Sequence, residues 1–256
     1  MVHEQKTLNV RGKSIEMLVG GEGPDLLYMH SAGGEIAWLP FFESLSSKFK
    51  VHVPAHPGFS NSSGLEEIDS IEDIVFHTTD LMKELDLKNP AMVGLSLGGW
   101  ISAEFATRYS ERISSLVLIA PVGMRPPEGD IFSASPKEMR QLVFSEPESD
   151  LAQGFIPDQG DAETMTMAFR AKQATARVGW NPYLHNRKLE GRLYRIDVPT
   201  LIIGADKDAL VSEEHCRLYA NGIANSKFVN IEGAGHAVPF ERPQDVADAV
   251  ISFLVG

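Results

Sequence analysis

The chain has little cysteine. Among its 256 residues there is a single one, Cys216, so no disulfide can form within the chain. Chains without disulfides are typical of reducing compartments, and we therefore expect a cytoplasmic protein. Cys216 lies shortly after Ser212 in a predicted helix, where we expect a packed thiol rather than a reactive one.

Cations are also in the minority. The chain carries 23 Lys and Arg against 35 Asp and Glu, which gives a formal net charge of −12. A surface of this sign repels phosphate backbones and anionic headgroups, so we expect neither a nucleic acid nor a membrane as partner. No apolar run approaches the ~18 residues that a membrane span needs. The first six residues lack the apolar stretch of a signal peptide.

Two kinds of ligand motif are missing as well. No cluster of His, Cys, Asp and Glu shows the spacing of metal ligands, so no metal is expected. The glycine-rich segment at residues 94–99 is not followed by Gly-Lys-Ser/Thr, which excludes a phosphate-binding loop of that type. We expect a protein that works without a cofactor on a small molecule.

Short apolar runs alternate with helical patterns along most of the chain. This alternation predicts an α/β fold with a mainly parallel sheet and helices on both faces. Residues 122–192 interrupt it with several prolines and mostly helical patterning. We therefore expect one α/β core from residues 1–121 and 193–256, and a helical insertion from residues 122–192. The expected strands are 7–10, 15–19, 25–30, 50–53, 90–93, 116–119, 199–204 and 227–231, and the expected helices outside the insertion are 37–48, 71–85, 100–109 and 243–254.

The segment Gly94-Leu95-Ser96-Leu97-Gly98-Gly99 follows a buried apolar run and precedes a helical pattern. A strand that turns sharply through a serine into a helix is the G-x-S-x-G nucleophile elbow. Glycines are needed there because a Cβ would clash with the tightly approaching backbone. The pattern predicts that Ser96 is a nucleophile whose hydroxyl is exposed at the start of the helix.

A serine hydroxyl needs a base, and the base needs an acid that orients it. His236 lies in the loop Gly233-Ala234-Gly235-His236 after the last expected strand, and Asp208 follows an earlier strand. The order Ser96, Asp208, His236 is the order of the hydrolase triad on α/β sheets. Asp206 remains an alternative to Asp208 as the acid.

Five segments together resemble the α/β-hydrolase superfamily over nearly the whole chain. The resemblance implies an α/β-hydrolase fold with an eight-stranded, mainly parallel sheet and a helical cap formed by residues 122–192. It also implies that the backbone N–H groups of Ala32 and Leu97 form the oxyanion hole. Relatives usually have His-Gly where this chain has His30-Ser31. The segments are 30–34, 57–62, 94–99, 199–211 and 235–243.

Apolar side chains in the insertion have two interpretations. Met165, Met167, Phe169, Trp180 and Tyr183 either line an apolar substrate pocket or form the small core of the insertion. For the substrate site we expect Ser31, Met165, Phe169, Trp180 and Val238, around an apolar acyl or aromatic group.

The remaining histidines have structural interpretations. We expect His30 to orient the loop that carries Ala32, and His3 to lie in a mobile tail. Packed or surface positions are expected for the others, which are His52, His56, His77, His185 and His215.

The resemblance implies a serine hydrolase of the carboxylic ester class that cleaves an ester or a lactone through an acyl-enzyme at Ser96. An alternative is carbon–carbon bond hydrolysis of a vinylogous diketone, since the cap size and the 28-residue gap from Asp208 to His236 are similar to those hydrolases. Against it, Ala237 stands where those enzymes commonly have an aromatic residue. A ligand receptor on a hydrolase scaffold is the alternative of another class. A monomer and a homodimer both remain open.

Overall fold

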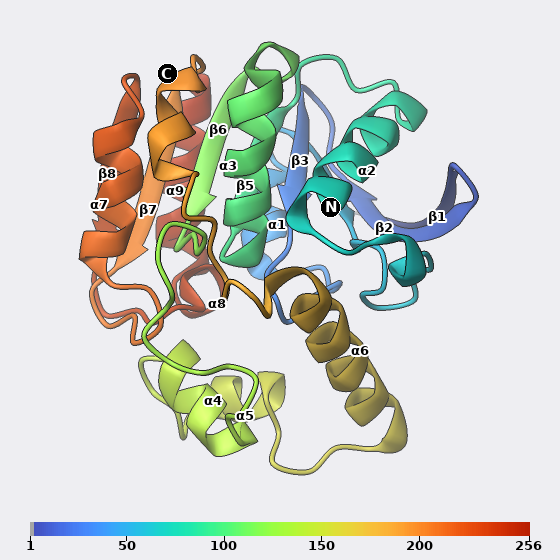
Figure 1. The fold of residues 1–256 in the computed structure, drawn as a ribbon, viewed down its shortest axis with the longest axis vertical. Helices are drawn as coiled ribbons and strands as arrows, with labels where there is room; N and C mark the ends of the chain where they lie inside the picture. The colour runs from blue at the N-terminus through green and yellow to red at the C-terminus, as the bar shows by residue number, and fades with distance from the viewer. Residues whose placement is uncertain (1–2) are drawn as a thin grey trace.

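The computed structural model describes residues 3–256, which fold around one eight-stranded sheet (Figure 1). The strands lie in the order β1-β2-β4-β3-β5-β6-β7-β8. β1 and β2 form an antiparallel hairpin, β2 pairs antiparallel with β4, and all other neighbours pair parallel. The strands are β1 (His3–Val10), β2 (Lys13–Gly20), β3 (Asp25–Met29), β4 (Lys50–Pro54), β5 (Ala91–Leu95), β6 (Ser115–Ile119), β7 (Thr200–Ala205) and β8 (Ser226–Ile231).

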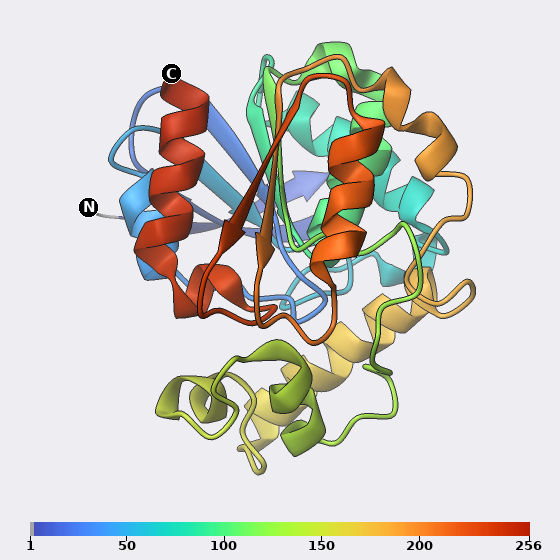
Figure 2. The ribbon, with the colours of Figure 1, turned by 90° about the vertical axis from the view of Figure 1, so that its left-hand side faces the viewer.

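The central strands are apolar on both sides because helices cover both faces of the sheet. Every residue of β5 and of β7 is buried. One apolar core lies beneath α2 (Ile71–Glu84), α3 (Leu97–Tyr109) and α7 (Glu213–Gly222). The other lies beneath α1 (Pro40–Leu45) and α9 (Pro243–Val255), which Figure 2 shows side by side. This is the expected α/β fold, with an eight-stranded, mainly parallel sheet and helices on both faces.

The segment between β6 and β7 carries three α-helices. Its helices are α4 (Pro136–Val143), α5 (Asp150–Phe155) and α6 (Ala162–Gly179). Figures 1 and 2 show them as a separate layer beyond the carboxyl ends of the parallel strands, and in Figure 1 α6 lies beside α4 and α5. Ligands of open α/β sheets bind at this edge. Short elements complete the chain: η1 (Leu65–Glu67), η2 (Ser110–Arg112), η3 (Glu190–Arg195) and α8 (Val238–Glu241).

Two local expectations were wrong. His3 is not in a mobile tail: it begins β1, pairs with Gly20, and its ring stacks on Trp38 with centroids 4.9 Å apart. The helix expected over residues 37–48 is only Pro40–Leu45, because it starts at the proline and ends where Ser46 bonds back to Phe42. A proline suits a first turn because its missing N–H has no intrahelical partner there.

Candidate active site

Ser96 stands at a strained turn between β5 and α3. Its backbone has φ 55° and ψ −111°, a conformation that costs a non-glycine residue about 1–3 kcal/mol. Backbone segments approach each other closely at this turn. A Cβ on Gly98 would lie 2.0 Å from the backbone oxygen of Met29, and a Cβ on Gly94 would lie 2.3 Å from the backbone oxygen of Gly98. The Ser96 N–H donates to the carbonyl of Ile119 on β6 at 2.9 Å, which fixes the turn to the sheet.

The structure brings His236 and Asp208 to Ser96 from two other loops at the same edge. The Nε2 atom of His236 lies 2.7 Å from Ser96 Oγ, and its Nδ1 atom lies 2.8 Å from Asp208 Oδ2. The other carboxylate oxygen of Asp208 accepts the backbone N–H groups of Leu210 and Val211, each at 2.8 Å. Because a carboxylate only accepts, Nδ1 of a neutral His236 carries the proton and Nε2 can accept one from Ser96.

Asp206, the alternative acid, has a different place. Its Oδ1 accepts the backbone N–H groups of Gly233 and Ala234, at 2.6 and 3.3 Å. These bonds hold the loop that carries His236. Asp206 therefore supports the loop, and Asp208 contacts the histidine ring.

A family model described as the alpha/beta hydrolase family matches residues 26–249, most of the chain. The chain belongs to the alpha/beta hydrolase family. Monoacylglycerol lipase ABHD6 of Homo sapiens is 27% identical over 267 residues, which cover 91% of this chain and 76% of that protein. The sequence match and the fold are those of a hydrolytic enzyme.

Solved structures share the fold at lower identity. The enol-lactonase from Burkholderia xenovorans LB400 has a TM-score of 0.82 at 21% identity and covers 98% of this chain and 100% of that chain. The 2-hydroxy-6-oxo-6-phenylhexa-2,4-dienoate hydrolase from Rhodococcus sp. strain RHA1 has a TM-score of 0.81 at 17% identity, covering 100% and 99%.

In this α/β-hydrolase, the loop after β3 is ordered by His30. The His30 Nε2 atom accepts the backbone N–H of His56 at 2.9 Å, so the ring proton is on Nδ1, which donates to the carbonyl of Ser31 at 2.7 Å. Burial lowers the pKa of His30 to about 4, only partly offset by the Ser31 bond, and keeps the ring neutral. His30 thus orients the loop, as expected from the sequence.

The two expected oxyanion-hole residues lie on the elbow and on the loop after β3. Leu97 directly follows Ser96 as the first residue of α3, where a backbone N–H has no intrahelical acceptor. Ala32 lies in the ordered loop after β3, and its carbonyl accepts a bond from Thr175 of α6 at 3.3 Å. The insertion therefore touches the loop that carries Ala32.

The residues expected at the substrate site do not lie together in one place. Ser31 is half-buried in the loop after β3 and its hydroxyl donates to Glu35. Val238 is fully buried in the core beneath α1 and α9, which argues against contact with a substrate. Val238 is two residues from His236 in the sequence, but it is the first residue of α8 and belongs to this apolar core.

The interpretation of the insertion's apolar residues as a small core is wrong for three of them. Met165, Phe169 and Trp180 are 44%, 72% and 64% exposed. Met167 and Tyr183 are half-buried. Trp180 lines an open groove of about 570 Å³ that contains none of Ser96, Asp208 and His236; its lining residues are Pro127, Glu128, Gly129, Asp130, Phe132, Trp180, Asn181 and Tyr183.

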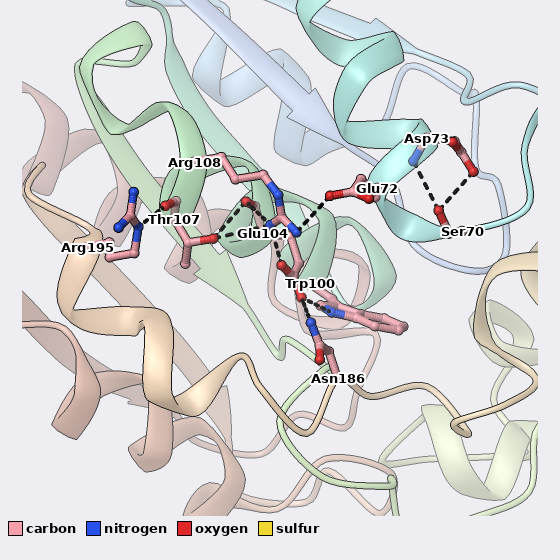
Figure 3. Close-up of polar contacts among 9 residues, drawn as sticks. All are labelled: Ser70, Glu72, Asp73, Trp100, Glu104, Thr107, Arg108, Asn186 and Arg195. Carbon is pink, nitrogen blue, oxygen red and sulfur yellow. Dashed lines mark hydrogen bonds and ion pairs between the residues drawn. The ribbon is translucent and has the colours of Figure 1, made fainter.

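The helix α3, which follows Ser96, is anchored by a buried carboxylate that the sequence analysis did not single out (Figure 3). Glu104 is 2% exposed. Its carboxylate accepts bonds from Arg108 and from Asn186, each at 2.5 Å, and from the Trp100 indole at 3.4 Å. Asn186 lies near the end of the insertion, so Glu104 ties the insertion to α3.

Within residues 3–256, no group of three or more His, Cys, Asp and Glu side chains is placed to hold a metal ion. In the same part of the chain, no helix is both long and apolar enough to cross a membrane. Cys216 is buried, and burial raises the pKa of its thiol far above the ordinary value.

Proposed function

We propose that this α/β-hydrolase is a serine hydrolase that cleaves a carboxylic ester or a lactone through an acyl-enzyme at Ser96. The observation that carries the proposal is the pair of hydrogen bonds from His236, to Ser96 at 2.7 Å and to Asp208 at 2.8 Å. Such distances are what a nucleophile, its base and the orienting acid require.

In the proposed first step, Ser96 Oγ attacks the carbonyl carbon while its proton moves to Nε2 of His236. Asp208 holds the ring and stabilises the imidazolium. The carbonyl oxygen becomes negative and is bound by the backbone N–H groups of Leu97 and Ala32; one such donor typically contributes ~2.7–4 kcal/mol. The His236 proton then goes to the departing alkoxide, which leaves the acyl group on Ser96.

In the second step, His236 takes a proton from water, and the hydroxide attacks the acyl carbon. The acid is released when Ser96 Oγ leaves and regains the proton from His236. These steps need no redox partner. Residues 122–192 act as a cap over Ser96 in this proposal, which is supported by the bond from Thr175 to Ala32.

Hydrolysis of p-nitrophenyl esters, of lactones and of a ring-cleavage dienone by the wild-type protein and by Ser96→Ala tests the proposal. We expect turnover of esters or lactones, reduced by at least about 10³-fold in Ser96→Ala because the nucleophile is lost. A serine-directed phosphonate should label the wild type at Ser96 and leave the variant unlabelled. The proposal is wrong if esters and lactones are turned over equally by both proteins.

Carbon–carbon hydrolysis is the second candidate and is favoured by the same arrangement of Ser96, Asp208 and His236. Turnover of the dienone alone would establish it. Labelling by phosphonate with no turnover of any substrate would instead favour a receptor on a hydrolase scaffold. We also propose a cytoplasmic location, from the single buried cysteine.

A further inference from the structure

The end of α4 packs tightly on the loop between β8 and α8, which carries His236 and is called the His236 loop below. The carbonyl of Val143, the last residue of α4, accepts the backbone N–H of Ala237 at 2.9 Å. A Cβ on Gly235 would lie 2.7 Å from the backbone nitrogen of Ser145 and 2.8 Å from the carbonyl oxygen of Val143. The insertion therefore contacts the chain directly before and directly after His236.

Glu241, the last residue of α8, joins the same two segments through its carboxylate. Its Oε2 atom accepts the backbone N–H of Gly235 at 2.6 Å. Its Oε1 atom accepts the backbone N–H of Ser145 at 2.9 Å and the Ser145 hydroxyl at 2.6 Å. One oxygen thus holds the residue that precedes His236, and the other oxygen holds the insertion.

Apolar side chains close the same junction. The ring of Phe240 stacks on that of Phe155 in α5, with centroids 4.9 Å apart. Phe144, from the insertion, and Ala237 belong to one small buried cluster. The part of the insertion that contains α4 and α5 is therefore packed against the His236 loop as well as bonded to it.

Three consecutive backbone N–H groups before His236 are bound by carboxylates. Asp206, which follows β7, accepts the first two, and Glu241 accepts the third. Asp206 ties the loop to the sheet, whereas Glu241 ties it to the insertion. Because this loop carries the ring, both ties bear on the 2.7 Å distance between His236 Nε2 and Ser96 Oγ.

We propose that Glu241 is a positioning residue of this hydrolase: its carboxylate couples the insertion to the His236 loop and so holds the His236 ring at hydrogen-bond distance from Ser96. The inference rests on the proposed function, in which His236 is the base for Ser96. Glu241 bonds the backbone of the loop and not the ring, so it acts on the reaction only through His236. Misplacing a catalytic group by about 1 Å can cost about 10²-fold in rate.

A double-mutant cycle with a serine-directed phosphonate tests this directly. The rate constant for labelling of Ser96 at saturating phosphonate is measured by mass spectrometry in the full chain. The four proteins are the wild type, Glu241→Ala, His236→Ala and the variant with both substitutions. We expect Glu241→Ala to slow labelling by about 10–100-fold, while the phosphonate concentration that gives the half-maximal rate stays unchanged.

The His236→Ala background separates positioning from a merely structural role. In that background Glu241→Ala should cause no further slowing, because the ring that Glu241 positions is absent. Slowing that persists undiminished in this background overturns the inference, since Glu241 would then act on Ser96 or on the insertion by another route. A wild-type labelling rate in Glu241→Ala overturns it too.

Glu138→Ala is the matched control. Glu138 accepts the backbone N–H and the hydroxyl of Ser135, at 2.8 and 2.7 Å, so it makes the same kinds of bond as Glu241, but at the other end of α4. We expect Glu138→Ala to be labelled as fast as the wild type. Equal slowing in Glu138→Ala and Glu241→Ala overturns the inference, because a general weakening of the insertion would then be the cause.

Glu241→Gln serves if Glu241→Ala does not fold. Its amide has one accepting oxygen, which replaces the bond to Gly235 or those to Ser145 but not both, so we expect a smaller slowing in the same direction. Labelling needs no turnover, so the two proposals fail separately. The expected cycle in a protein that hydrolyses no ester or lactone would leave this inference standing and overturn the ester hydrolase proposal.

Discussion

At the scale of single residues, the elbow depends on glycines that stand against backbone. Residue 98 faces the carbonyl of Met29 and residue 94 faces that of Gly98, so neither neighbour is a flexible side chain that can move aside. The strain at Ser96 persists because β5, β6 and α3 hold both sides of the turn.

Gly98→Ala should lower both stability and activity. The new Cβ would lie 2.0 Å from a backbone oxygen of β3, so either the strand or the start of α3 must shift. We expect a loss of about 1–3 kcal/mol in the free energy of unfolding, and a large loss of ester hydrolysis because Ser96 moves with the turn. Urea unfolding and steady-state kinetics measure the two effects.

Gly154→Ala is the control for this substitution. Gly154 lies in α5, and a Cβ there meets nothing within 4 Å. We expect this change to be neutral or to stabilise by about 0.5–1 kcal/mol, since alanine favours the helix. Equal losses in the two variants would show that the close approach at Gly98 is not the cause.

At the scale of elements, polar side chains in the C-terminal half of α3 join this helix to its neighbours, in addition to the apolar contacts of its buried face. Arg108 bonds Glu104 on its own helix and reaches Glu72 of α2 at 3.4 Å (Figure 3). Arg195 of η3 donates to the carbonyl of Thr107 at 2.8 Å. The segments before and after the insertion thus meet on the helix that begins at the candidate nucleophile.

Glu104→Ala should destabilise the protein much more than Glu72→Ala. Glu104 is buried, and its removal leaves the polar groups of Arg108, Asn186 and Trp100 without their acceptor. We expect this loss to lower the free energy of unfolding by about 3 kcal/mol. Glu72 is an exposed partner of the same arginine, so its loss should cost at most about 0.5 kcal/mol. Unfolding in urea, followed by circular dichroism, measures the stability of both variants. Similar losses of stability would show that the bonds to the Glu104 carboxylate do not anchor α3.

Much of the element pattern could be predicted because its signals are local. Short apolar runs bounded by Gly and Pro predicted the strands. A serine just before a helical pattern is a local cap signal, and Ser70 before α2 accepts the Asp73 N–H at 3.3 Å. The meeting of Ser96, Asp208 and His236 also follows from local signals, since all three come after parallel strands whose carboxyl ends share one edge.

The rest depends on tertiary contacts that periodicity does not report. Met165 and Phe169 have the spacing of a buried helix face, but the first half of α6 extends past the core and leaves them exposed. Glu104 is one charge on a helix, which ordinarily indicates a solvated face. Glu35 lies in a loop, and only the burial of its Oε2 atom distinguishes it from a surface carboxylate.

At the scale of the whole molecule, buried histidines are unusually numerous. Five of them have pKa values lowered chiefly by burial, so they are neutral in the folded protein. They lie on several elements around the sheet: His30, His52, His56, His77 and His215. In the unfolded chain each takes up a proton near its ordinary pKa of about 6.5.

The protein should therefore lose stability in mild acid. A pKa that is lowered on folding means that the unfolded state binds more protons, so stability is complete above about pH 6.5 and falls as the pH drops toward the folded-state values, about 4 for His30, His77 and His215. Each such group contributes up to about 1.4 kcal/mol per pH unit in that window. Urea unfolding between pH 7.5 and 4.5 measures the slope.

His77→Phe isolates one of these contributions. His77 lies on α2, is 6% exposed, and its Nε2 atom has no hydrogen-bond partner in the described chain, so an apolar ring of similar size loses little. We expect the slope of stability against pH below 6.5 to become shallower by up to about 1.4 kcal/mol per pH unit. His3→Gln, at an exposed histidine, should leave the slope unchanged. A wild-type slope retained in His77→Phe would mean that this histidine is already charged in the fold, and that its burial imposes no acid sensitivity on the molecule.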